Sequence, residues 1–225
     1  MLKQTACVLF FFTLLGARAE SPIELAKRGL AAVEAQVNPP LKRLVAEARL
    51  NFYVGRYSTS SSEKEAAFTR GLELARKALE VDSHDPDALL WSAVNDGQAA
   101  LMRGKLAALF SVRRMVQTLT DLKAIAPSHD HFAADRILGA LYLAAPAVIS
   151  IGSVDKAREH FEAALKGAPQ YPANQALYAH FLWETGDKEK AKRLAREVIQ
   201  SQELEKYPLE APDWKEALEP IFSTP

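Results

Sequence analysis

The sequence contains 225 residues, and its 28 basic side chains are balanced by 28 acidic ones. This balance leaves no excess of positive charge for binding nucleic acid or an anionic membrane surface, so neither partner is expected. The length suffices for one sizeable core or for a stack of small units.

The first 19 residues differ in kind from the rest of the chain. The basic Lys3 is followed by an apolar core of 10 residues from Ala6 to Leu15 and then by Ala17-Arg18-Ala19. This order is typical of a secretory signal peptide, and the core is too short to span a bilayer. We therefore expect a signal peptide over 1–19, cleaved near Ala19, and a single helical domain over 20–225.

Cysteine usage narrows both the chemistry and the location. The one cysteine, Cys7, stands at the start of the apolar core and not after its end, which is the wrong place for lipid attachment at a lipobox. Without Cys7, the exported chain can form no disulfide, thiolate metal site or cysteine nucleophile. The sequence thus predicts an exported, periplasmic protein without a lipobox and without a transmembrane span in the mature chain.

Beyond residue 20, apolar residues recur at helical spacing, and strand-like alternation is nearly absent. Prolines fall between the periodic segments or in a first helical turn, as in Asp85-Pro86, where Asp85 is a good N-cap. Gly186-Asp187 likewise ends one helix and caps the next. About ten helices are predicted, over residues 22–37, 41–57, 63–81, 86–103, 107–125, 131–145, 154–167, 172–185, 187–201 and 212–219.

The stretch Ile137–Gly152 contains 16 residues without a charge. A membrane span needs about 20 residues, and Pro146 interrupts this stretch, so a core helix followed by an apolar loop over 147–154 is the better interpretation. The apolar insertion 146–152 is then either part of the core or an exposed surface that contacts a ligand or partner.

The helix predicted over 154–167 places Ala157, Phe161 and Ala164 on one face. Ala157 has a counterpart at Ala191, 34 residues further along, which is the period of tetratricopeptide repeats. The chain resembles that family, with Phe161, Ala164 and Pro169 on its aromatic, small and proline positions. This resemblance implies an all-α fold of stacked antiparallel helix pairs, with the best repeats at 130–169 and 172–203.

One subfamily resembles the chain more closely. The segment ILGALYLAAPAVISIGSVDKAREHFEAALKGAP carries a proline-containing apolar insertion before the AxxxFxxA helix. With the flanking blocks over about residues 63–201, it is similar to the periplasmic T component of tetratricopeptide-associated TRAP transporters. That resemblance implies a protein that pairs with a periplasmic substrate-binding protein, assists the uptake of an organic ligand and can form trimers. Bacterial members are often lipid-anchored, and this chain lacks the cysteine for such an anchor.

Motifs that carry chemistry are absent from the sequence. Phosphate-cradling loops need glycines close together, whereas no two glycines here lie nearer than seven residues apart. There is also no G-x-S-x-G elbow and no H-E-x-x-H zinc helix. We therefore expect no cofactor, no catalytic residues and no enzyme activity.

Two histidine clusters require separate interpretation. His129-Asp130-His131 offers two metal ligands and an acid, but a helix junction with Asp130 as N-cap explains it better, because no third ligand stands at metal-site spacing. His160 is flanked by Glu159 and Glu162, which point away from it on a helix. A catalytic dyad would need a partner from another helix, so a solvated or interhelical role is the simpler expectation.

In stacked repeats the first helix of each pair lines a concave groove. The repeat register places seven residues on that wall, which suits an extended organic ligand or a peptide segment. They are Leu90, Val94, Arg136, Ala140, Leu143, His180 and Trp183.

Together these patterns predict a non-enzymatic binding or accessory protein that holds a small organic ligand or a substrate-binding-protein partner in its groove. The alternative is an envelope scaffold that assembles proteins through the same wall without a small ligand.

Overall fold

The computed structural model describes residues 20–35 and 40–223, so the predicted signal peptide lies outside the described residues. The described residues form ten α-helices and one 3₁₀ helix, with no strand among them. The helices are α1 Pro22–Glu34, α2 Pro40–Tyr57, α3 Ser61–Val81, α4 Pro86–Met102, α5 Lys105–Ile125, α6 His129–Ala144, α7 Val154–Gly167, α8 Pro172–Glu184, α9 Lys188–Gln200, η1 Gln202–Lys206 and α10 Ala211–Ser223.

The predicted all-α class is confirmed, and the helix boundaries follow from local chemistry. Asp85 caps α4 by accepting a hydrogen bond from the Ala88 N–H, with Pro86 in the first turn. Asp187 caps α9 in the same way, just after Gly186 at a φ of 98°. The short helix η1 was not predicted, because five residues carry no periodic signal.

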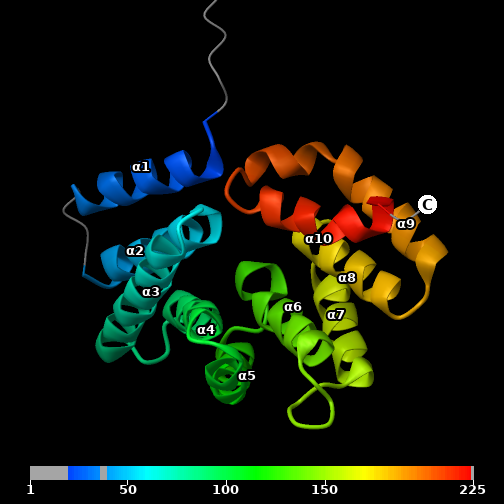
Figure 1. Cartoon of the computed structure of the whole chain (residues 1–225), viewed down its shortest axis with the longest axis horizontal. Helices are drawn as coiled ribbons and strands as arrows, with labels where there is room; N and C mark the ends of the chain where they lie inside the picture. The colour runs from blue at the N-terminus through cyan, green and yellow to red at the C-terminus, as the bar shows by residue number, and fades with distance from the viewer. Residues whose placement is uncertain (1–19, 36–39, 224–225) are drawn as a thin grey trace, which may run out of the picture.

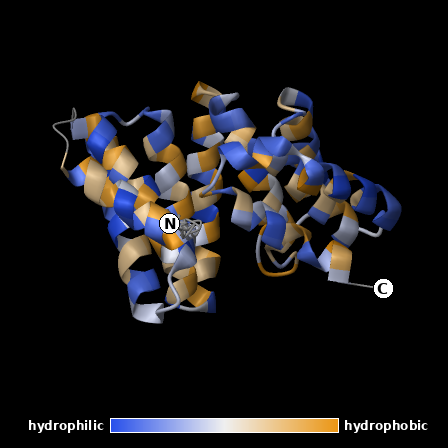
Figure 2. Ribbon diagram, turned by 90° about the horizontal axis from the view of Figure 1, so that it is seen from above, coloured by the Kyte–Doolittle hydropathy of each residue, from blue (hydrophilic) through white to orange (hydrophobic). Residues whose placement is uncertain are grey.

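Consecutive helices pack as pairs, α2 on α3, α4 on α5, α6 on α7 and α8 on α9 (Figure 1). Each helix mixes hydrophobic and hydrophilic residues along its length, so one side of it can be buried while the other stays in solvent (Figure 2). In α7 the predicted face of Ala157, Phe161 and Ala164 is buried. Ala191, one repeat later, is also buried, which agrees with the 34-residue step.

The array curves until its C-terminal segment returns to its first helices (Figure 1). Arg56 of α2 pairs with Asp213 of α10 at 2.9 Å, and the Tyr57 hydroxyl donates hydrogen bonds to the Leu209 carbonyl and to Asp213. Burial raises the pKa of Asp213 despite the opposing attraction of Arg56. Contacts between residues more than 150 positions apart could not be predicted from a local pattern.

The uncharged stretch 137–152 divides between α6 and the loop that follows it. Helix α6 ends at Ala144, and the loop continues to Ser153, whose N–H donates to the Tyr142 carbonyl. Among the described residues, no helix is long and apolar enough to cross a membrane. The prediction of a helix followed by a loop is therefore confirmed.

Candidate functional site

An apolar cavity of about 640 Å³, partly open to solvent, lies between α4, α5 and α6. Val94 and Leu101 form its α4 wall, Leu109 and Met115 its α5 wall, and Ala140 belongs to its α6 wall. A volume of this size is in the range of small-molecule sites, which are concave and mostly apolar.

Small side chains explain why a hollow remains where three helices meet. Gly97 on α4, Ala108 on α5, and Ala140 and Ala144 on α6 all line the cavity. Protein interiors normally fill such a space with interlocking large side chains. Gly97 lets the Met115 side chain pack close to α4, since a Cβ there would lie 2.7 Å from it, while the alanines place only methyl groups on the wall.

The loop after α6 completes the wall. Pro146 and Ile149 line the cavity, while Val148 is 96% exposed and Ile149 67% exposed. Gly152 fixes the loop, since a Cβ there would lie 2.0 Å from the Ala145 carbonyl oxygen. The apolar insertion 146–152 is thus a loop that borders the cavity and also presents hydrophobic side chains to solvent.

Further hydrophobic residues of α4 and α5 are exposed. Leu101 lines the cavity and is still largely exposed, while Leu106 and Phe110 at the start of α5 are more than 60% exposed. Leu106 and Phe110 do not line the cavity and lie on the opposite side of α5 from Ala108 and Val112, so they form a separate exposed apolar surface.

Three of the lining residues carry polar side chains, Gln98, Lys105 and Ser111. Ser111 is 1% exposed, and its hydroxyl has no hydrogen-bond partner among the described residues. Lys105 is the first residue of α5 and is exposed. These groups lie on an otherwise hydrophobic surface and could fix the orientation of a bound molecule.

None of the predicted site residues lies on α5. One signal was available, because Leu106 to Phe110 reads Leu-Ala-Ala-Leu-Phe, which is apolar on every side of a helix. A helix that is apolar all round either lies inside a core or exposes part of that surface. The repeat register considered only the first helix of each pair, so α5 was missed.

The structure brings two of the seven predicted wall residues together in this cavity, Val94 and Ala140. Leu90 lies instead inside the core shared by α4, α5 and α6. Leu143 packs against the separate hydrophobic core of the C-terminal helices. A binding role for these two residues stays a prediction, and the structure gives each a packing role.

Arg136 is buried in a network that holds the start of α6. Its guanidinium pairs with the Asp130 carboxylate at 2.9 Å and donates to the His131 carbonyl at 3.2 Å and to Asn174 Oδ1 at 3.0 Å. The guanidinium carbon also lies 5.1 Å from the centre of the Tyr171 ring. Arg136 therefore directs its donors to the protein itself.

His180 and Trp183 lie on α8, away from the cavity. Trp183 is buried beneath Lys188, whose Nζ lies 3.7 Å from the ring centre and donates to the Trp183 carbonyl. His180 keeps a buried Nδ1 without a hydrogen-bond partner among the described residues. Their predicted ligand contacts stay predictions.

His160 has an interhelical role. Its Nδ1 lies 2.7 Å from the carboxylate of Asp135 on α6, which also pairs with Lys123 of α5 at 2.7 Å. The His160 ring stacks on Tyr142 at 5.5 Å. Burial opposes ionisation of Asp135, but hydrogen bonds from His160 and Lys123 hold its pKa below the usual range. The sequence did not reveal Asp135 as the partner from another helix.

The cluster His129-Asp130-His131 is a helix junction without a metal-site arrangement. Among the described residues, no group of three or more potential ligands could hold a metal ion. The expected N-cap role of Asp130 is wrong, because Asp130, His131 and Phe132 adopt left-handed backbone angles and Ser128 precedes the helix. Such angles cost about 1–2 kcal/mol per residue. Arg136, which holds Asp130 and the His131 carbonyl, offsets that cost.

We expect stability to fall slightly as the pH rises from about pH 6 to about pH 8, through the pair of His129 and Asp87. His129 Nε2 lies 3.1 Å from the Asp87 carboxylate, which raises the pKa of His129 above its usual 6.5, with smaller contributions from Asp130 and Asp85. A histidine whose pKa is higher in the folded protein than in the unfolded chain stabilises the fold fully below its unfolded-state pKa. This stabilisation is lost as the pH rises through its folded-state pKa. Because Asp87 is half exposed, the effect should stay below about 1 kcal/mol.

Urea unfolding of the wild type and of His129→Gln at both pH values measures this effect. The wild type should lose more stability than the variant between the two values. Equal pH dependence of the two proteins would contradict the assignment.

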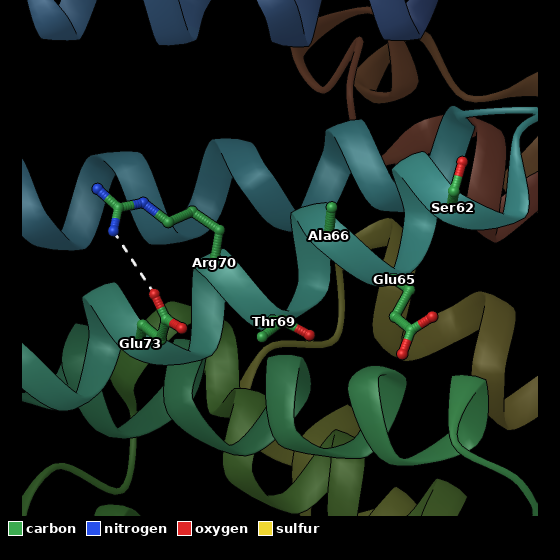
Figure 3. Close-up of a pocket in the computed structure, with 6 residues that line it drawn as sticks. All are labelled: Ser62, Glu65, Ala66, Thr69, Arg70 and Glu73. Atoms are coloured by element: carbon green, nitrogen blue, oxygen red, sulfur yellow. Dashed lines mark ion pairs between the residues drawn. The ribbon is translucent and has the colours of Figure 1, made fainter.

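A second hollow of about 390 Å³ lies on the outer face of α3 (Figure 3). Its lining residues all come from this one helix, and Arg70 pairs with Glu73 across it at 3.5 Å. Without a wall from a second element this hollow can enclose little of a ligand. The cavity between α4, α5 and α6 is therefore the better candidate site.

Comparisons with known proteins agree with this architecture. The Tetratricopeptide repeat family matches residues 152–218, which span α7, α8, α9 and the first part of α10. No curated protein matches the chain. A crystal structure of a thermophilic TPR protein from Thermus thermophilus is similar, with a TM-score of 0.61 over 90% of this chain and 89% of that chain.

The two chains share 14% sequence identity, so the likeness concerns the fold alone. The resemblance to the transporter component has no counterpart in these matches and stays a prediction. The family match over 152–218 and the curved array of helix pairs together show a tetratricopeptide-like fold.

Proposed function

We propose that this protein is a non-enzymatic binding protein that holds a small apolar organic molecule in the cavity between α4, α5 and α6. The observation that carries the proposal is the cavity itself, about 640 Å³ with three polar side chains on its wall. The cavity is mostly apolar and partly open to solvent, so a bound apolar molecule would remove its hydrophobic wall from water.

The role proposed for such binding is that of an accessory protein to transport, similar to the T component of TRAP transporters. The sequence resemblance and the apolar insertion, which borders the cavity through Pro146 and Ile149, support this role. Export to the periplasm is proposed from the signal-peptide pattern of residues 1–19. A periplasmic substrate-binding protein would be the partner, and a trimer the assembly.

Filling the cavity tests the binding proposal. Val94→Trp combined with Ala140→Phe places two large rings on facing walls, and we expect affinity for dodecanoic acid to fall more than about tenfold. Isothermal titration calorimetry measures the affinity, and circular dichroism checks that the variant remains helical. The matched control, Ala66→Phe on the outer face of α3, places the same ring in the second hollow and should leave the affinity unchanged.

Equal binding by the wild type and the filled variant, both folded, would exclude this cavity as the site. Native mass spectrometry of the purified protein adds an independent measurement, because a copurified molecule and the number of subunits appear in the same spectrum.

A scaffold that assembles proteins without a small ligand is the second candidate. The exposed Leu106, Phe110 and Val148 favour it, since such side chains suit a protein interface. Copurification of envelope proteins with the wild type and with the filled variant alike, and no bound small molecule, would support the scaffold over the ligand carrier.

A further inference from the structure

The wall of the cavity carries one polar group that the protein leaves unsatisfied. The Ser111 hydroxyl is buried, lines the cavity and has no hydrogen-bond partner among the described residues. A serine inside a helix usually points to solvent or bonds a carbonyl of the preceding turn. A buried hydroxyl without a partner costs free energy, so a ligand oxygen or a water should occupy the space in front of it.

A second polar feature lies at the start of the same helix. Helix α5 follows Gly104, which has a φ of 107° and offers no side-chain cap. Its first N–H groups therefore lack a side-chain acceptor, and they carry the positive end of the helix dipole.

Lys105 occupies the first position of α5, lines the cavity, and makes no ion pair with any described residue. A lysine at a helix N-terminus is electrostatically unfavourable unless an anion balances it. Lysine and helix terminus together form an anion-binding end to the apolar cavity.

These two features define the chemistry of a ligand. Ser111 lies six positions after Lys105, which corresponds to roughly 9 Å along the axis of α5. Resting on the function proposed above, we propose that the cavity takes an apolar carboxylic acid with an oxygen substituent along its chain. Its carboxylate lies at Lys105 and the start of α5, and its hydroxyl or carbonyl oxygen bonds the Ser111 hydroxyl.

The wall between these points is hydrophobic, which argues for an aliphatic chain over a sugar or a peptide. Leu101, Ala108 and Leu109 contribute to it and offer no hydrogen bonds through their side chains. A polyol or peptide would leave several of its polar groups unpaired there, at a cost for each one. A chain with one internal oxygen loses no hydrogen bond, since Ser111 can donate or accept.

The test compares dodecanoic acid with a series of hydroxydodecanoic acids that differ in hydroxyl position, titrated into the purified protein by calorimetry. One hydroxyl position should bind roughly five- to tenfold more tightly than dodecanoic acid, which is the effect of one buried hydrogen bond. In Ser111→Ala this preference should disappear, while affinity for dodecanoic acid changes less than about twofold. The control Ser62→Ala, on the outer face of α3, should keep the preference.

The acid group is tested with dodecanol. Lys105→Gln should lower the affinity for dodecanoic acid roughly fivefold or more, because the variant removes the charge that attracts the carboxylate. The affinity for dodecanol should stay unchanged. A Ser111→Ala variant that binds every hydroxy acid as the wild type does would overturn the inference, since a water would then satisfy Ser111. The inference would also be overturned if Lys105→Gln bound dodecanoic acid and dodecanol as tightly as the wild type does.

These results separate the inference from the proposed function. Wild-type protein that binds dodecanol and dodecanoic acid alike, with no gain from any hydroxyl, refutes the oxygen-bearing acid and leaves an apolar ligand in place. If the folded wild-type protein binds neither dodecanol nor any of the acids under the same conditions, the apolar cavity is not a binding site for them.

Discussion

Arg136→Ala is expected to lower the free energy of unfolding by about 1–3 kcal/mol, the cost of leaving buried acceptors such as Asn174 Oδ1 without their donor. Arg136 is buried and donates to Asp130, His131 and Asn174. Its removal leaves these groups without their donor and releases the left-handed turn at 130–132. Urea unfolding followed by circular dichroism measures the loss.

The matched control is Arg196→Ala on the exposed face of α9, which should change stability by less than about 0.5 kcal/mol. If Arg136→Ala proves as stable as the control, the network at the start of α6 is not a stabilising element. If it keeps full stability but loses ligand, the predicted place of Arg136 on a binding wall is correct after all.

Trp214→Ala should also be costly, by about 3–5 kcal/mol, because it removes a large buried aromatic side chain. Trp214 of α10 contacts Tyr171 at 5.4 Å and Tyr207 at 5.2 Å between ring centres. Tyr171 in turn packs against Arg136 and stacks on His131. The loss should therefore reach the start of α6 as well as α10, and hydrogen exchange resolved by segment measures how far it spreads.

Phe222→Ala serves as the control, since Phe222 belongs to the same helix and is about half exposed. It should cost less than about 1 kcal/mol, as surface substitutions usually do. Faster exchange confined to α10 in Trp214→Ala would contradict the coupling to α6 through Tyr171.

The contacts that join α2 to the C-terminal segment bear on both predictions. They include side-chain contacts of Arg49 with Glu210 and of Arg56 with Asp213. Because burial raises the pKa of Asp213, the ion pair costs desolvation energy that its attraction offsets only in part. The helix α10 is therefore anchored mainly by the hydrophobic contacts of Trp214, Leu218 and Ile221.

The helical class was predictable because it depends on near neighbours in the chain. Ala157 and Phe161 repeat on one face of α7, and Asp85 with Pro86 sets the start of α4. These features act within one or two turns, so a sequence displays them directly. The step from Ala157 to Ala191 adds the stacking of pairs, because equal units pack in equal ways.

The triplet Ser-His-Asp shows where local patterns fail. At Ser83–Asp85 its aspartate caps α4, whereas at Ser128–Asp130 the aspartate adopts a left-handed conformation and pairs with Arg136. The same three residues fold differently because Asn174 and Tyr171, from a later helix pair, support the second site. Local spacing held no information about these distant supports.

The sequence by itself determined the α-helices, the caps at Asp85 and Asp187, the repeat period and the apolar character of the insertion 146–152, because each depends on residues close together in the chain. Only the tertiary structure decided that Val94 and Ala140 share a cavity with α5, that Arg136 is buried, and that Asp135 is the partner of His160. The physical reason is that cavities and buried polar networks depend on which faces of distant helices meet, and small shifts in packing decide whether a gap is filled.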